Sequence, residues 1–308
     1  MPRRALHRRF QETAVNHDLH QDLHALLPGR GAASRRRTLG LMLGAGYAAA
    51  AAPVLAQQAL RTGSDGLLAG EVSYTVHGFQ VRAYRAAPQG RTGLPVVLVV
   101  SEIFGVHDYI ADVCRRLAHA GYLAIAPDLF ARQGDPRAFG EVAKLMSELI
   151  AKVPDAQVMA DLDGAVHWAG ANGGDAAKVA ITGFCWGGRI TWLYAAHGPV
   201  KAAVAWYGRL VGQDSDLTPK QPVEITPILK TPVLGLYGGK DGGIPLDTVD
   251  KMKVALQEGS GAAKASEFVI YPDAPHAFHA DYRPSYRQQA AEDGWRRMLA
   301  WFKHNGVA

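Results

Sequence analysis

Cys185 stands in a short motif whose residue types are typical of a covalent catalyst. The hexapeptide Gly183–Gly188 reads G-F-C-W-G-G, which is a G-x-nucleophile-x-G pattern with cysteine in the middle. It follows an apolar run at 178–182, which predicts a buried parallel strand, and precedes a run at 189–196, which predicts a buried helix. Such a turn strains its central residue and points backbone N–H groups at a thiolate or an oxyanion. The alternative is an inert cysteine in a glycine-rich turn.

Three other reactive side chains follow predicted strands. Glu102, Asp241 and His276 each come directly after an apolar run or in the loop beyond it. Because the ends of parallel strands meet at one edge of a sheet, we expect all three near Cys185. The order of nucleophile, acid and histidine is that of an α/β-hydrolase. His276 would transfer the proton and Asp241 would orient its imidazole. Alone, Asp241 reads as a turn former and His276 as an ordinary histidine.

The same fold predicts an oxyanion hole from two backbone N–H groups. One belongs to Trp186, the residue after the nucleophile, and the second to Ile103 in the loop after an early strand. From its position alone, Glu102 is either functional or a turn cap. Tyr207 is one of several aromatic residues near strand ends, where they line an apolar pocket or pack in the core.

The elements that must position these residues form an alternating pattern of strands and helices. This alternation predicts an α/β-hydrolase fold, a doubly wound and mostly parallel sheet with helices on both faces. We expect a single domain over 71–308, preceded by a polar lead-in at 57–70. The expected strands and helices are a hairpin at 71–85, strands at 95–100, 122–126, 178–182, 200–207, 232–237 and 267–271, a helix over 110–118 that ends at Gly121, a helical excursion at 135–154, a long helix at 155–171, and helices at 189–196, 246–257 and 286–302.

Residues 1–56 have the features of a twin-arginine signal peptide. A basic stretch containing Arg35-Arg36-Arg37 precedes an uncharged, alanine-rich stretch at 40–56, which ends in a small-residue cleavage pattern at Ala56. A membrane anchor is the alternative, but this stretch is short and interrupted for a span. The predicted partner is therefore the twin-arginine translocation machinery, and the predicted location is periplasmic or secreted.

The signal peptide also explains the charge of the chain. It carries eight arginines against three acidic residues, an excess equal to the net charge of +5 of the whole chain. The remainder is neutral overall, which gives no argument for nucleic acid. The two cysteines build no disulfide framework, and we expect Cys114 in the core. A reactive Cys185 is at risk of oxidation outside the cytoplasm.

Other chemistries fit the sequence less well. His276, His279 and Asp281 lie close together in sequence but lack the helical spacing of a zinc motif, so we expect no metal and no cofactor. His107 and Asp108 either line the pocket or cap a helix, and capping is favoured. A thiol redox protein would want a resolving cysteine beside Cys185, and C-x-x-C is not present.

Five motifs together resemble the dienelactone hydrolase (carboxymethylenebutenolidase) family. They are S-E-I-F-G-V at 101–106, P-D-L-F-A-R at 127–132, the hexapeptide at 183–188, G-K-D at 239–241 and H-A-F at 276–278. The resemblance implies a hydrolase that opens a lactone or ester through an acyl-cysteine. It also implies that Glu102 interacts with the nucleophile and helps to convert it to the thiolate when substrate binds.

The same resemblance implies a substrate carboxylate held by two arginines. Arg132 matches the first of them, whereas Ala280 stands at the position of the second. Arg283, Arg209 and His279 are candidate replacements. The expected function is hydrolysis of a small ester or lactone, by a monomer. The alternative is an exported α/β-hydrolase-fold protein that binds a ligand without turnover.

Overall fold

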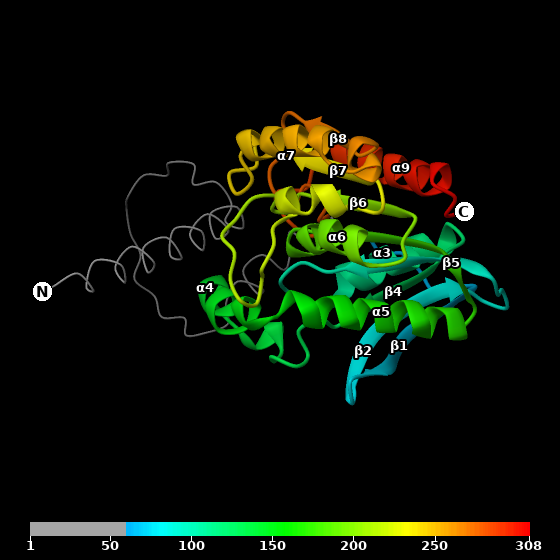
Figure 1. Ribbon diagram of the computed structural model, residues 1–308. Helices are drawn as coiled ribbons and strands as arrows, with labels where there is room; N and C mark the ends of the chain where they lie inside the picture. Colours follow the sequence, from blue (N-terminus) through cyan, green and yellow to red (C-terminus); the bar gives the residue numbers. More distant parts are fainter. Residues whose placement is uncertain (1–59) are drawn as a thin grey trace, which may run out of the picture.

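Eight strands form a single sheet with helices on both faces (Figure 1). The computed structural model describes residues 60–308, so the predicted signal peptide and the first three residues of the predicted lead-in lie outside the described residues. The predicted fold, a mostly parallel sheet between helices, is confirmed over the described part of the chain. No helix there is long and apolar enough to cross a membrane.

The strand order across the sheet is β1-β2-β4-β3-β5-β6-β7-β8. β1 pairs antiparallel with β2, β2 pairs antiparallel with β4, and all later neighbours are parallel. The strands are β1 (Leu67–Val76), β2 (Phe79–Pro88), β3 (Leu94–Val100), β4 (Leu123–Pro127), β5 (Gly174–Phe184), β6 (Ala202–Trp206), β7 (Val233–Gly238) and β8 (Glu267–Tyr271).

The first hairpin turns at His77 and Gly78, which both have positive φ, as a two-residue turn between twisted strands requires. Its first strand begins at Leu67, four residues before the predicted hairpin. Residues 67–70 therefore belong to the sheet and not to a lead-in. They lack the strict alternation of buried and exposed side chains that marks the later part of β1, which is why the sequence pattern missed them.

Two pairs of helices cover the two faces of the sheet. α5 (Asp155–Ala171) and α6 (Trp186–His197) pack on one face, and α3 (Asp108–His119) and α9 (Gln288–His304) on the other (Figure 1). The remaining helical segments are η1 (Pro136–Ala138), α4 (Val142–Lys144), η2 (Leu145–Leu149), η3 (Ile150–Lys152), η4 (Pro222–Glu224), η5 (Thr226–Ile228), α7 (Leu246–Glu258) and α8 (Gly261–Lys264). The predicted helical excursion at 135–154 thus contains η1 and a continuous helical run over 142–152, made of α4, η2 and η3.

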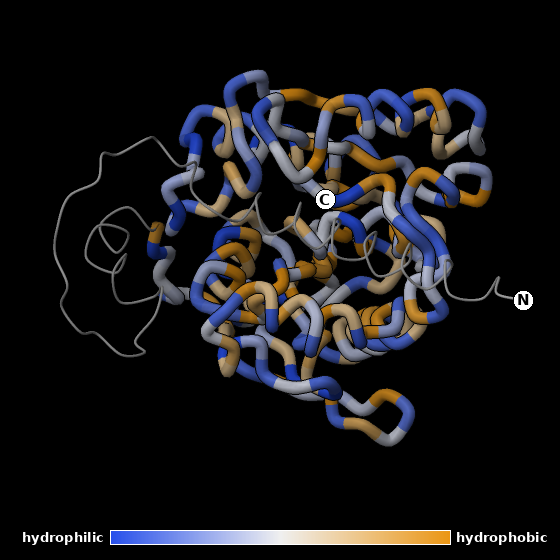
Figure 2. The backbone as a smooth tube through the Cα atoms, turned by 90° about the vertical axis from the view of Figure 1, so that its left-hand side faces the viewer, coloured by the Kyte–Doolittle hydropathy of each residue, from blue (hydrophilic) through white to orange (hydrophobic). Residues whose placement is uncertain are grey.

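The core lies between these layers. The central strands β3 and β4 are apolar and buried on both faces, as expected for parallel strands between helices. Figure 2 shows hydrophobic stretches through the middle of the molecule and alternating colours along the outer helices. Cys114 is fully buried in α3, which confirms its predicted place in the core, and both Cys114 and Cys185 are free thiols. The ends of β3, β5, β7 and β8 lead into the segments that carry the predicted reactive residues.

Candidate active site

Cys185 is held in a strained turn between β5 and α6. Its φ of 55° and ψ of −115° lie outside the usual regions for a residue with a side chain. Its backbone N–H donates to the carbonyl of Trp206 at 3.0 Å, and its own carbonyl accepts from Gly188 at 2.9 Å. Cys185 is therefore the N-cap residue of α6, and its sulfur makes no capping hydrogen bond. This is the sharp strand-to-helix turn that the motif predicts.

The glycines of the motif are required by close backbone approaches. A Cβ on Gly183 would lie 2.2 Å from the carbonyl oxygen of Gly187, and one on Gly187 would lie 2.4 Å from that of Val100. Real Cβ atoms do not approach backbone oxygens so closely, and the backbone here is part of the sheet and helix. The pattern G-x-C-x-G therefore reflects packing of α6 onto β3 and β5.

His276 and Asp241 form a buried hydrogen-bonded pair. His276 Nδ1 lies 2.8 Å from Asp241 Oδ2. The other carboxylate oxygen accepts the backbone N–H groups of Gly243 at 2.9 Å and Ile244 at 3.1 Å. Because a carboxylate only accepts, Nδ1 carries the proton and Nε2 remains for the nucleophile. The turn after β7 thus fixes the acid, and the acid fixes the imidazole.

The electrostatic surroundings of His276 favour its protonated form. Burial lowers the pKa of His276, but the charge of Asp241, the charge of Cys185 and hydrogen bonds to both raise it well above the ordinary value. The structure therefore brings Cys185, His276 and Asp241 together, from the segments that follow β5, β8 and β7. The edge of the Tyr207 ring packs against the imidazole, with ring centroids 5.1 Å apart.

Glu102 is buried at the end of β3 with an unusual set of neighbours. One of its oxygens, Oε1, has no hydrogen-bond partner among the described residues. Burial raises the pKa of Glu102, but the hydrogen bond and charge of His107 and the charge of Arg283 outweigh burial and lower it. Glu102 is therefore a buried carboxylate that stays ionised and keeps a free acceptor at the site.

His107 corrects one sequence prediction. It occupies the N-cap position of α3 but makes no side-chain cap hydrogen bond. Its Nε2 instead lies 3.3 Å from Glu102 Oε2, and its ring packs edge-on against Tyr282. An imidazole at an N-cap is a poor acceptor for helix N–H groups, whereas a buried carboxylate five residues earlier is a strong partner.

Arg283 lies at the site and has no carboxylate partner among residues 60–308. Its guanidinium carbon is 4.9 Å from the centre of the Phe104 ring, and its Nε donates to the Tyr282 hydroxyl at 3.0 Å. No carboxylate oxygen of the described chain lies within 4 Å of this guanidinium. Burial lowers the pKa of Arg283, but Tyr282 and then Glu102 raise it above the ordinary value. It is a fixed cation with unused hydrogen-bond donors.

Arg132, in contrast, already has an acidic partner. Its Nη1 pairs with the fully buried Asp161, its Nη2 donates to the carbonyl of Val76 at 3.4 Å, and its guanidinium carbon lies 4.3 Å from the Phe79 ring centre. The local sequence gave no signal for Asp161, because it lies 29 residues away on α5. A role for Arg132 in binding substrate stays a prediction.

Tyr207 and Arg209 occupy different surroundings after β6. Tyr207 has a positive φ of 38°, and its hydroxyl is buried without a hydrogen-bond partner in the described chain. Burial, then the charges of Glu102 and Cys185, raise the pKa of Tyr207 well above its ordinary value, so the hydroxyl stays protonated. Arg209 lines a separate hollow of about 300 Å³ with Val211, Ile244 and Thr248.

The predicted oxyanion donors lie on the two segments that flank the nucleophile. Trp186 is the first residue of α6, so its backbone N–H has no partner within the helix. Ile103 is buried in the turn after β3, where Gly105 N–H donates to Glu102 O at 3.4 Å. The indole of Trp186 packs on Phe130 with ring centroids 4.8 Å apart.

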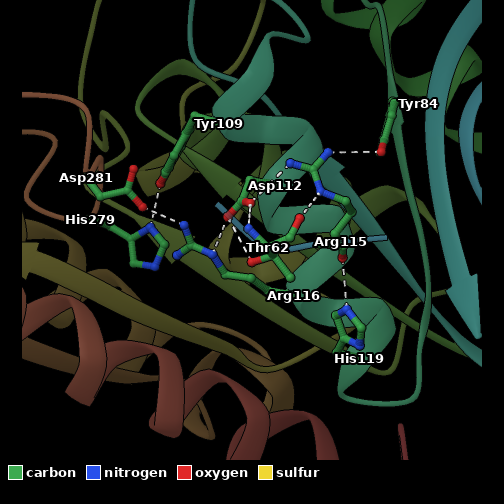
Figure 3. A network of polar contacts seen from close by, with 10 residues as sticks. Thr62, Tyr84, Tyr109, Asp112, Arg115, Arg116, His119, His279 and Asp281 are labelled. Atoms are coloured by element: carbon green, nitrogen blue, oxygen red, sulfur yellow. Dashed lines mark hydrogen bonds and ion pairs between the residues drawn. The ribbon is translucent and has the colours of Figure 1, made fainter. Parts of the chain in front are cut away.

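The residues considered for a metal have other partners. His279 Nδ1 lies 2.5 Å from the hydroxyl of Tyr109, and Asp281 pairs with Arg116 at 2.5 Å (Figure 3). Burial and then Arg116 lower the pKa of His279 to about 3, so its imidazole is neutral. Tyr109 lies 170 residues from His279 in the sequence, and no local pattern predicts this contact.

Comparison with known proteins identifies relatives over most of the chain. The model of the dienelactone hydrolase family matches residues 81–306. A protein of Methylorubrum extorquens, provisionally named carboxymethylenebutenolidase, is 56% identical over 277 residues, which is 89% of this chain and 94% of the relative. A protein of Escherichia coli K12 with the same provisional name is 56% identical over 263 residues, 85% of this chain and 96% of the relative.

A solved structure agrees with these relatives. The crystal structure of a provisionally named dienelactone hydrolase from Klebsiella pneumoniae superposes with a TM-score of 0.74 and 58% sequence identity. The match covers 77% of this chain and 98% of that chain.

Proposed function

The chain belongs to the dienelactone hydrolase family and is a hydrolase, and on this premise we propose that it opens a small ester or lactone through an acyl-cysteine on Cys185. The observation that carries the proposal is the alignment of three groups. Asp241 Oδ2 lies 2.8 Å from His276 Nδ1, and the charge and hydrogen bond of Cys185 raise the pKa of the same imidazole. A non-catalytic binding protein is not favoured, since the family is one of hydrolases.

The proposed reaction has two steps. The proton of Cys185 moves to His276 Nε2, a transfer that the raised pKa of His276 favours, and the thiolate attacks the carbonyl carbon of the substrate. The oxyanion formed there accepts hydrogen bonds from the N–H groups of Trp186 and Ile103. The carbon–oxygen bond to the leaving alkoxide then breaks, and the alkoxide takes the proton from His276. In the second step His276 removes a proton from water, which attacks the acyl-cysteine. The carbon–sulfur bond breaks, the leaving thiolate takes the proton back from His276, and the product acid loses its own proton to the solvent.

Turnover of p-nitrophenyl acetate tests this proposal. We expect hydrolysis by the full chain and its loss in Cys185→Ala and His276→Ala. Mass spectrometry of the quenched reaction should find the acetyl group on Cys185. Cys114→Ala is the matched control, because that thiol is fully buried in α3 and has no part in the proposed triad. Undiminished turnover in folded Cys185→Ala would contradict the assignment.

The proposed substrate carries a carboxylate, and Arg283 is its proposed anchor. The guanidinium is positioned between Phe104 and Tyr282 and lacks a carboxylate partner among the described residues, whereas Arg132 is paired with Asp161. The test compares p-nitrophenyl acetate with mono-p-nitrophenyl succinate. Arg283→Met should raise KM for the succinate ester alone by roughly tenfold, the value of one charged hydrogen bond. If KM for the succinate ester rises in Arg132→Met and not in Arg283→Met, Arg132 is the anchor.

Tyr207 and Glu102 have proposed roles beside the nucleophile. The protonated hydroxyl of Tyr207 is a free donor for the substrate, and the free oxygen of Glu102 is an acceptor that controls the Cys185 thiol. Succinate should accelerate alkylation of Cys185 by iodoacetamide in the full chain but not in Glu102→Gln. Acceleration of equal size in both proteins would remove Glu102 from this role.

Export by the twin-arginine pathway is proposed from the sequence of residues 1–56. The protein recovered from the periplasm of an exporting cell should begin at Gln57 or close to it. Replacement of Arg35 and Arg36 by lysine should keep it in the cytoplasm. An intact residue Met1 in the periplasmic protein would contradict cleavage. A monomer is proposed too, and the mass of the purified protein by light scattering tests it.

A further inference from the structure

A chain of polar contacts outside the proposed catalytic residues links the segment before β1 to the loop that carries His276 (Figure 3). We call residues 60–64 the N-terminal strap. The backbone N–H of Thr62 donates to Asp112 Oδ1 at 2.6 Å, and Arg115 Nε donates to the carbonyl of Thr62 at 2.7 Å. His119 Nε2 lies 3.0 Å from the carbonyl of Gly63. The strap is thus attached to one side of α3 along its last two turns.

Arg116 continues the chain from α3 to the histidine loop. Its Nε donates to Asp112 Oδ2 at 2.6 Å, and its Nη2 donates to Asp281 Oδ2 at 2.5 Å. Asp112 and Asp281 are only 2% and 1% exposed, so both carboxylates need partners. The strap supplies Asp112 with the backbone N–H of Thr62 at 2.6 Å and with the hydroxyl of the same residue at 3.3 Å. The strap therefore completes the hydrogen bonding of Asp112, a buried carboxylate that shares the Arg116 guanidinium with Asp281.

Asp281 lies on the same loop as His276, five residues later in the sequence. A second contact between α3 and this loop is the Tyr109 hydroxyl to His279. The loop between β8 and α9 has no strand or helix of its own, so these contacts with α3 help to hold it, beside the hydrogen bond from Lys240 N–H to the carbonyl of Ala274 and the packing of Phe278 on Trp206. α3 in turn begins immediately after His107, which contacts Glu102. One helix thus connects the strap, the histidine loop and the glutamate of the site.

From this connection we propose that the N-terminal strap is a positioning element of the active site. It holds Asp112, Arg116 and Asp281 in register and so places His276 against Cys185. This inference rests on the proposed function, because it takes His276 as the base. The strap itself lies beside α3, and none of its hydrogen bonds is to Cys185, His276 or Asp241 in the described chain. Its effect is therefore on kcat and not on the binding of a small ester.

The test compares two substitutions of Thr62 in the full chain. Thr62→Pro removes the N–H that Asp112 accepts, whereas Thr62→Ala keeps it and is the matched control. With p-nitrophenyl acetate, Thr62→Pro should lower kcat about tenfold with KM changed less than twofold, because a small displacement of a base is costly. Thr62→Ala should stay within twofold of the unmodified chain. Equal kcat in the two variants would overturn the proposal.

A double-mutant cycle tests the route through Asp281. Asp281→Asn weakens the contact with Arg116, through which the strap is proposed to act. The fall in kcat in Asp281→Asn should therefore already contain the fall that Thr62→Pro causes. The double variant should therefore be no slower than Asp281→Asn alone. Additive losses would mean that the strap acts by another route and would overturn the proposal. If Thr62→Pro does not fold, Asp112→Asn takes its place in the same cycle with the same two outcomes.

A measurement without turnover separates this inference from the proposed function. If the full chain hydrolyses no ester, the proposed function fails, but hydrogen exchange of residues 276–283 still reports on the strap. Faster hydrogen exchange of residues 276–283 in Thr62→Pro than in Thr62→Ala would agree with the proposal that the strap holds this loop in place. Identical exchange in both variants overturns it, whatever the activity.

Discussion

The two reacting groups of the proposed site are held in different ways. Cys185 is placed by backbone alone, through the hydrogen bond to Trp206 and the glycines that let α6 approach β3 and β5. His276 is placed by side chains, through Asp241 and through the contacts of its loop with α3. Substitutions near Cys185 should therefore disturb folding, whereas substitutions near His276 should disturb the rate and leave the fold intact.

The loop itself contains a second contrast. His276 and His279 are three residues apart and both are buried, yet their pKa values move in opposite directions. Asp241 and Cys185 raise the pKa of His276 against the effect of burial. His279 packs between aromatic rings and near Arg116, and burial lowers its pKa to about 3. A neighbouring carboxylate thus decides whether a buried imidazole is protonated.

The largest effect is expected from a methyl group at the nucleophile turn. Gly187→Ala would bring a Cβ to 2.4 Å from the carbonyl oxygen of Val100, and neither backbone can move freely. We expect a loss of about 3 kcal/mol or more in the free energy of unfolding and no activity. Gly261→Ala is the matched control, since nothing lies within 4 Å of its Cβ. Equal urea midpoints for the two variants would show that this turn is not sterically determined.

Asp241→Asn should lower the rate strongly with little effect on the fold. The amide can still accept the N–H groups of Gly243 and Ile244, but it favours the wrong tautomer of His276. We expect kcat for p-nitrophenyl acetate to fall by about 10⁴-fold, as the loss of such an acid does elsewhere. Asp273→Asn, an exposed aspartate nearby, should stay within twofold. A fall of less than tenfold in Asp241→Asn would remove it from the triad.

The lowered pKa of His279 predicts that the free energy of unfolding falls in mild acid. Its pKa is about 3 in the folded chain and 6.5 in the unfolded chain, so below pH 6.5 the unfolded state binds more protons. The free energy of unfolding should drop by about 2 kcal/mol between pH 6.5 and pH 5 from this group. His276 adds nothing there, because a raised pKa contributes fully below 6.5 and is lost only as pH rises through the folded value.

Urea unfolding at several pH values measures this slope in the full chain and in His279→Gln. The glutamine carries no titrating group, so its slope between pH 6.5 and pH 5 should be smaller by that amount. His276→Gln is the control and should change the slope only above pH 6.5. An unchanged slope in His279→Gln would mean that His279 is not buried as a neutral imidazole.

The smallest effect is expected from one hydroxyl between α3 and the loop. Tyr109→Phe keeps the ring and removes the bond to His279, which should cost about 1 kcal/mol of stability and lower kcat a few-fold. Tyr286→Phe, in the same loop, is the control and should change neither quantity measurably. If Tyr109→Phe has no more effect than Tyr286→Phe, the Tyr109 hydroxyl does not help to hold the loop of His276, and the contrast with Cys185 is contradicted.

The sequence predicted the local parts of the site well. The apolar run before Cys185, the glycines around it and the order of Cys185, Asp241 and His276 are local or sequential features. They correspond to a strand, a sharp turn and the loops after β7 and β8. Hydrophobic periodicity and the need for glycine at a tight turn depend on residues that are close together in the chain, so both can be recognised in the sequence. The early start of β1 at Leu67 was missed for the same reason, because its pattern there is irregular.

Partners distant in sequence were decided only by the tertiary structure. His107 had the position of a helix cap but lies against Glu102, and Arg132 had the position of a substrate anchor but pairs with Asp161. The contact of Tyr109 with His279 spans 170 residues. Such pairings depend on how the helices pack across the sheet, and no spacing along the chain encodes them. The sequence by itself determined which residues have reactive chemistry, and packing decided which charges each of them meets.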